Sequence, residues 1–92
     1  MKAREDVLLR QVAGETLLIP TGEAALRLNG MATINEAGLV LWNALQKECT
    51  PEELAEALMA EYAVARATAL ADAAEFVEKM AAAGLLEVPV HA

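Results

Sequence analysis

Few residues of this 92-residue chain have side chains that act as nucleophiles, bases or metal ligands. His91 is the single histidine and stands second from the end, a position typical of a tail. Cys49 is the single cysteine, and free cysteines are usually buried as small hydrophobic residues. A nucleophile needs a base beside it, and with one histidine near the end of the chain and one cysteine we expect no such pair. The sequence therefore predicts a binding protein without catalytic residues.

Carboxylates are more abundant, but their spacing does not indicate a metal site. The candidates on one expected helix are Glu52, Glu53, Glu56 and Glu61. They lack the Asp, Asn and Gly spacing of a calcium loop. A solvated helix face explains them, because acidic side chains favour the positive N-terminal end of a helix. The five glycines are scattered singly and form no phosphate-binding loop. We expect neither a metal nor an organic cofactor.

The charge balance limits the classes of partner. Fourteen acidic residues against seven Lys and Arg residues give a formal net charge of −7. Nucleic-acid binding depends on cations that displace counterions from phosphates, whereas the cations here are spread singly. The N-terminus has no signal-peptide pattern, and no stretch reaches the roughly 20 apolar residues of a membrane span. We expect a cytoplasmic protein with neither a nucleic-acid nor a membrane partner.

The first third of the chain has the pattern of short strands. The expected strands cover Val7 to Val12, Thr16 to Ile19 and Met31 to Ile34. The first two flank a turn at Ala13-Gly14, which predicts an antiparallel hairpin. Asn29-Gly30 favours a type I′ turn, from which the third strand should emerge. The segment from Ala24 to Leu28 fits a helical turn and a strand equally, so its structure stays open.

From Asn35 onward, apolar residues recur at helical spacing. Asn35 is a good N-cap for a first helix. Thr50, with Pro51 at the first helical position and Glu53 completing a capping box, predicts the start of a second helix that ends near Tyr62. A third helix is expected over roughly Arg66 to Ala83, ended by Gly84. Ala65 stands where a polar cap for this last helix would be expected.

The order of these elements indicates the fold class. Three short antiparallel strands followed by three helices are typical of an α+β domain resembling a winged helix-turn-helix. We expect one domain over residues 1–92, with its folded part at about 6–87. Trp42, the largest side chain of the chain, and Met80 are expected in its core.

The third expected strand offers a site for an extended peptide. Met31-Ala32-Thr33-Ile34 has neither a charge nor a proline, the usual guards of an edge strand. Beside it, the last helix is expected to present Leu70, Ala73, Ala74 and Val77, most of them small enough to leave a groove. A peptide could add a strand at this edge and bury apolar side chains against the helix. A strand that is interior, or covered by the C-terminal tail, is the alternative.

Several segments share their order and spacing with a known family. They are Val7-Leu8-Leu9-Arg10, Ile34-Asn35-Glu36-Ala37-Gly38 with Leu41-Trp42, Thr50-Pro51-Glu52-Glu53-Leu54 with Leu58 and Glu61-Tyr62, Asp72 with Phe76-Val77 and Met80, and Gly84-Leu85-Leu86. Together, from Asp6 to Glu87, they resemble the coenzyme PQQ synthesis protein D family, peptide-chaperone domains also called RiPP recognition elements.

The resemblance implies a winged-helix fold that holds the leader segment of a ribosomally made precursor peptide. Such a domain presents the leader to a modifying enzyme, typically a radical SAM protein. In the family the leader pairs with the third strand and packs against the third helix. Carried onto this chain, the binding residues would be Met31, Ala32, Thr33, Ile34, Leu70, Ala73, Ala74 and Val77.

Two other hypotheses stay open. A DNA-binding winged helix has the same order of elements, although the charges of the last helix, Arg66 and Lys79 against Asp72, Glu75 and Glu78, disfavour a duplex. A homodimer or a generic assembly module could use the same open strand edge.

Overall fold

The computed structural model describes residues 1–27 and 32–87 of the chain. The predicted Asn29-Gly30 turn, Met31 of the predicted strand and the tail with His91 lie outside the described residues. The elements are β1 (Val7–Val12), β2 (Glu15–Pro20), α1 (Gly22–Arg27), β3 (Ala32–Ile34), α2 (Glu36–Ala44), α3 (Pro51–Glu61) and α4 (Arg66–Ala82). The predicted α+β order of three strands followed by three helices is confirmed. The segment whose structure the sequence left open lies largely in the short helix α1, between the second and third strands.

The strands form one antiparallel sheet in the order β1-β2-β3. β1 and β2 make the expected hairpin, with Val7 opposite Pro20 and Val12 opposite Glu15. Ala13 and Gly14 join them at φ values of 53° and 83°. Two consecutive positive φ angles are typical of the type I′ turn, whose twist matches that of the strands it connects. Among the described residues, β3 pairs with β2 alone, with Ile34 opposite Thr16 and Ala32 opposite Leu18, so it is an edge strand of this sheet.

Local capping explains where α2 and α3 begin, whereas α4 begins without a cap. Asn35 Oδ1 accepts a hydrogen bond of 2.8 Å from the Gly38 backbone N–H, which starts α2. Thr50 and Glu53 form the predicted capping box at α3, with hydrogen bonds of 2.9 and 3.2 Å. Ala65 provides no side-chain hydrogen bond to α4. That long helix therefore depends on packing rather than on a cap.

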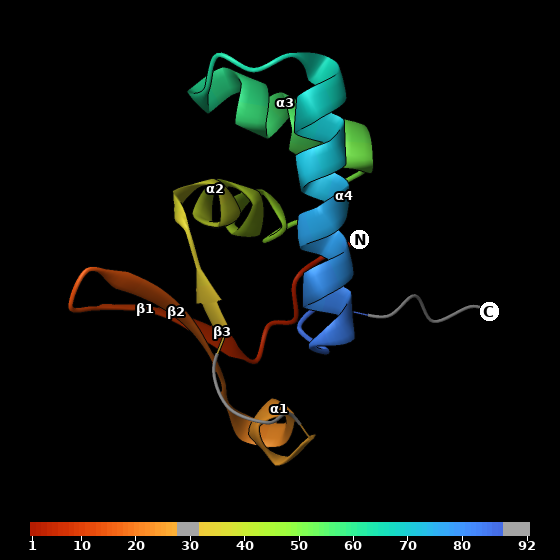
Figure 1. Cartoon of the computed structure of the whole chain (residues 1–92). Coiled ribbons are helices and arrows are strands. Elements are labelled where there is room, and N and C mark those ends of the chain that lie inside the picture. The colour runs from red at the N-terminus through yellow and green to blue at the C-terminus, as the bar shows by residue number, and fades with distance from the viewer. Residues whose placement is uncertain (28–31, 88–92) are drawn as a thin grey trace.

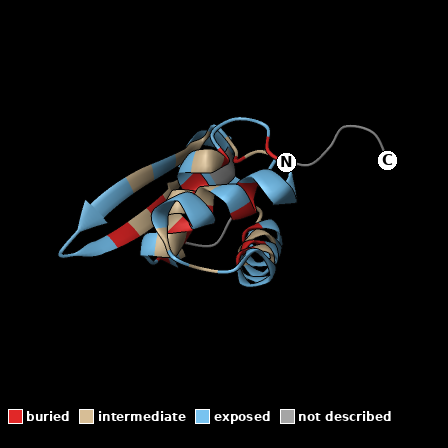
Figure 2. Cartoon of the chain, turned by 90° about the horizontal axis from the view of Figure 1, so that it is seen from above, coloured by how far each residue is buried: buried red, intermediate tan, exposed pale blue. Residues whose placement is uncertain are grey.

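The core lies where helices α2 to α4 meet the sheet. Figure 2 shows buried residues gathered there, while the turn between β1 and β2 is exposed. Trp42 is 2% exposed and Met80 is 6% exposed, which confirms both as core residues. Gly84 has a φ of 78° and follows the end of α4, and beyond it Leu85 and Leu86 fold back into the core.

The first residues of the chain are held between two distant segments. The Ala3 backbone N–H donates to Leu45 O at 2.8 Å, and Ala3 also forms a β-bridge with Leu86. On the same stretch, the Glu87 N–H donates to Lys2 O at 2.8 Å. Ala3 is 2% exposed and belongs to the core, so the core begins before the expected boundary near residue 6.

Figure 1 shows the hairpin of β1 and β2 projecting away from the helices, with β3 running up to the start of α2. Helices α3 and α4 pack against each other, and α2 contacts both. The strand edge and the helices thus meet at the junction between β3 and α2. In the described part of the chain, no helix combines the length and the apolar character needed to cross a membrane.

Candidate peptide-binding site

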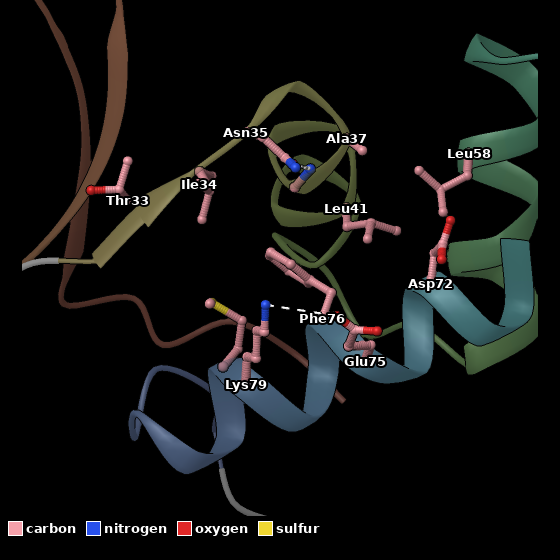
Figure 3. A pocket seen from close by; sticks show the side chains of 12 residues that line it. Thr33, Ile34, Asn35, Ala37, Leu41, Leu58, Asp72, Glu75, Phe76 and Lys79 are labelled. Atoms are coloured by element: carbon pink, nitrogen blue, oxygen red, sulfur yellow. Dashed lines mark hydrogen bonds and ion pairs between the residues drawn. The ribbon is translucent and has the colours of Figure 1, made fainter.

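A cavity of about 330 Å³ opens at the junction of β3, α2 and α4. Apolar side chains from four elements line it, namely Ile34, Leu41, Leu58, Phe76 and Met80. Figure 3 shows the Phe76 ring projecting from α4 towards β3 and α2, between Ile34 and Leu41. We call this space the edge cavity, because Thr33 and Ile34 of the edge strand belong to its lining.

Three charged residues of α4 also line the edge cavity: Asp72, Glu75 and Lys79. Lys79 Nζ lies 3.7 Å from Glu75 Oε1, one helical turn away, and both side chains are 71% exposed. Such an exposed pair contributes little to stability, because water and salt screen it. The cavity therefore combines an apolar interior with a polar rim of mixed charge, an arrangement suited to ligand binding.

Beside the cavity, β3 offers backbone hydrogen-bonding groups. The strand pairs with β2 on one side, and no other strand among residues 1–27 and 32–87 pairs with it on the other. Thr33 is exposed, whereas Ile34 is 8% exposed and packs into the core. An edge strand presents unpaired N–H and C=O groups to solvent. An extended peptide could therefore hydrogen-bond to β3 and place alternate side chains in the edge cavity.

Gly38 brings α2 close to both walls of the edge cavity. A Cβ atom at this position would lie 3.1 Å from Ile34 Cβ and 3.1 Å from Phe76 Cε1. Both contacts are tighter than ordinary van der Waals contact between carbon atoms. The glycine therefore allows the Phe76 ring to lie directly against the first turn of α2.

The predicted site residues are only partly brought together. Thr33 and Ile34 line the edge cavity, and Ala32 is half-buried in the same strand. The four site residues predicted on the last helix do not line this cavity. These residues are Leu70, Ala73, Ala74 and Val77. Ala73 is 1% exposed within the core, Leu70 and Val77 are half-buried against it, and Ala74 is exposed. Their role in peptide binding stays a prediction.

The cavity wall from α4 instead consists of Asp72, Glu75, Phe76, Lys79 and Met80. The first four share a face through spacings of three and four residues. Sequence reasoning missed this face, because it followed the apolar stripe of the helix and three of these residues are charged. The signal that could have found it is Phe76, the only phenylalanine, which lies at the border of that stripe.

A second cavity of about 440 Å³ adjoins the first. Its lining comes from the start of α2 and the end of α3, together with Asp72 of α4: Asn35, Glu36, Ala37, Leu58, Tyr62, Val64 and Asp72. We call it the corner cavity. Because Asn35 and Glu36 follow β3 directly, this cavity lies beyond the C-terminal end of the edge strand.

Cys49 and the acidic residues of α3 considered for chemistry line neither cavity, and those acidic residues are Glu52, Glu53, Glu56 and Glu61. Cys49 is 6% exposed, which confirms the expected buried thiol, and its Sγ donates to Ala44 O at 2.9 Å. Burial raises the pKa of this thiol, so the reactive thiolate form is disfavoured. Within the described ranges, no group of three or more His, Cys, Asp and Glu residues could hold a metal ion.

Comparison with known proteins points to one family. The family model of coenzyme PQQ synthesis protein D (PqqD) matches residues 7–86. The solved structure of TbiB1 in complex with the TbiA(beta) leader peptide is similar to this chain, with a TM-score of 0.75 and 26% sequence identity. The similarity covers 99% of this chain and 100% of that one. A search of curated proteins gave no match. The chain therefore belongs to the coenzyme PQQ synthesis protein D family.

Proposed function

We propose that this chain is a RiPP recognition element that binds the leader segment of a ribosomally synthesised precursor peptide. The leader adds a strand to the outer edge of β3 and places apolar side chains in the edge cavity. The observation that carries this proposal is the position of the outer edge of β3, with which no described strand pairs, directly beside an apolar cavity. Family membership and the similarity to TbiB1 bound to a leader peptide support it.

The energetics assign the larger share of the affinity to side chains. Four strand hydrogen bonds at about 0.5–1.5 kcal/mol each contribute roughly 2–6 kcal/mol. Micromolar binding requires about 8 kcal/mol, and ordering the peptide costs more. Burial of two or three aliphatic side chains, at about 1.5–3 kcal/mol each, supplies the difference. Phe76, at the centre of the edge cavity, should therefore be the most sensitive contact.

The bound leader would be presented to a modifying enzyme, and we propose a radical SAM protein as this partner. The chain itself would hold the peptide and take no part in the chemistry. Because the precursor is made on the ribosome, we place this work in the cytoplasm. We expect the chain to co-purify with a radical SAM enzyme. The leader should be required for this association or should strengthen it.

The binding proposal can be tested with short synthetic peptides selected from a displayed random library and titrated by calorimetry. Phe76→Ser should weaken the selected peptides at least about tenfold, since it removes roughly 1.5–3 kcal/mol of apolar burial. Amide exchange at Ala32 to Ile34 should slow on binding, because the added strand protects the backbone. Met59→Ser is a matched control, since Met59 is a partly exposed apolar residue of α3 outside both cavities.

Two results would contradict this proposal: affinity that Phe76→Ser leaves unchanged, or binding without protection of β3. The helix face predicted from the sequence is tested in the same titrations by Leu70→Ala and Val77→Ala. Loss of affinity in these variants, with the circular dichroism spectrum intact, would add their face of α4 to the site.

The same edge of β3 also offers strand pairing to a second copy, so homodimerisation is the competing use of this surface. Sedimentation with and without a selected peptide separates the two uses. If the protein is monomeric both with and without peptide, the result supports the use of this strand edge for the leader alone. A dimer that dissociates when peptide is added shows that both partners use this edge.

A further inference from the structure

The edge cavity and the corner cavity share part of their lining. Asn35, Ala37, Leu58 and Asp72 belong to both. Figure 3 shows the Asp72 carboxylate beside Leu58, away from the pair formed by Lys79 and Glu75. A peptide that pairs with β3 and fills the edge cavity can therefore continue directly into the corner cavity, beyond the C-terminal end of the strand.

The two cavities differ in how their charges are balanced. In the edge cavity, Glu75 has Lys79 as an ion-pair partner at 3.7 Å. Among the described residues, the carboxylates of Glu36 and Asp72 line the corner cavity, and no lysine or arginine does. Within the described residues, neither carboxylate forms an ion pair. The side chains that line the corner cavity therefore carry a net negative charge.

The remaining lining of the corner cavity is mostly apolar. Ala37, Leu58 and Val64 contribute aliphatic side chains, and Tyr62 contributes an aromatic ring. Lysine and arginine side chains match this combination, because their methylene stems pack on apolar surface while the charged group stays at the rim. An aromatic ring nearby adds a favourable cation–π contact.

We propose that the corner cavity binds a lysine or arginine side chain of the leader peptide, next to an aliphatic residue held in the edge cavity. This inference rests on the proposed function and specifies the chemistry of the peptide. Because the corner cavity follows the C-terminal end of β3, an antiparallel leader would carry this basic residue on the N-terminal side of its strand-forming segment. A parallel leader would carry it on the C-terminal side.

The test uses the synthetic peptides selected above, with lysine, norleucine or glutamate placed in turn at each position flanking the strand-forming segment. Norleucine keeps the aliphatic stem of lysine without its charge. At one flank, the lysine peptide should bind about 2- to 5-fold more tightly than the norleucine peptide, and glutamate should bind most weakly. Added salt should reduce the preference for lysine, because it screens exposed charges.

The double variant Glu36→Gln with Asp72→Asn should abolish the preference for the lysine peptide over the norleucine peptide. Glu52→Gln with Glu78→Gln is the matched control, since it removes the same charge from exposed residues outside both cavities. This control should keep the preference.

Three outcomes would overturn the inference. Equal binding of the lysine and norleucine peptides would leave the proposed function intact, but it would reject the proposal that the corner cavity binds a basic residue. An equal loss of preference in the double variant and in its control would assign the effect to the net charge of the protein. If no peptide binds at all, the proposed function fails, and this inference fails with it.

Discussion

Among single residues, Gly38 and Phe76 together determine the shape of the edge cavity. The ring of Phe76 occupies the space that a side chain at position 38 would need. Sequence reasoning placed Trp42, Met80 and Cys49 correctly inside the protein, because size and apolar character decide burial. It could not find the contact of Phe76 with Gly38, since that depends on two helices whose relative position the sequence does not reveal.

Gly38→Ala tests this contact. The added Cβ should push the Phe76 ring into the edge cavity and lower the affinity for the selected peptides several-fold. Stability should change by no more than about 1 kcal/mol, because the greater helix propensity of alanine offsets part of the overpacking. Urea unfolding and peptide titration measure the two effects separately. Full peptide affinity in the folded variant would show that the ring does not limit the cavity.

Among the elements, α4 combines three roles on different faces. One face packs in the core through Ala69, Ala73 and Met80, another lines the edge cavity, and the rest is exposed; Met80 belongs to both the core and the cavity lining. The sequence predicts the bounds of this helix well, because its apolar period and Gly84 are local signals. The face turned to the cavity depends on where β3 and α2 lie, and this explains why the predicted face differs from the observed cavity lining.

The start of α4 also offers a prediction on stability. Ala65 occupies the N-cap with extended backbone angles, φ −72° and ψ 153°, but makes no capping hydrogen bond, and no acidic residue follows in the first turn. Ala65→Asp should stabilise the protein by about 1 kcal/mol, because its carboxylate can accept from a free backbone N–H and complements the helix dipole.

Chemical denaturation of the two proteins measures this difference. Ala63→Asp is the control, since Ala63 is an exposed residue just before the cap and outside any helix. It adds the same charge and should change stability by less than about 0.5 kcal/mol. Equal effects of the two substitutions would show that charge, and not capping, is responsible.

For the whole molecule, the distribution of charge separates peptide binding from DNA binding. The winged-helix order of elements is shared by both, so fold alone does not distinguish them. On α4, Arg66 lies 3.7 Å from Glu56 and Lys79 lies 3.7 Å from Glu75. Both cations of the helix thus have carboxylates close by. The net charge of −7 was evident from composition, but these pairings required the folded chain.

A gel-shift experiment at low salt tests whether this distribution of charge prevents DNA binding. Low salt strengthens any contact with phosphates, so it gives duplex DNA the best chance to bind. We expect no retarded band with a random-sequence duplex, whereas a basic winged-helix protein run alongside should give one. A band that appears with this chain and weakens as salt is added would restore the DNA-binding hypothesis.

The bridge between Ala3 and Leu86 has a consequence for how the protein folds. It joins residues far apart in the sequence, so its formation closes a loop over most of the polypeptide. Closing so long a loop costs entropy that local contacts within the β1–β2 hairpin or between α3 and α4 do not incur. These local units should assemble early, and the bridge between Ala3 and Leu86 should form last. In native-state hydrogen exchange, the amides of Ala3 and Glu87 should accordingly open together.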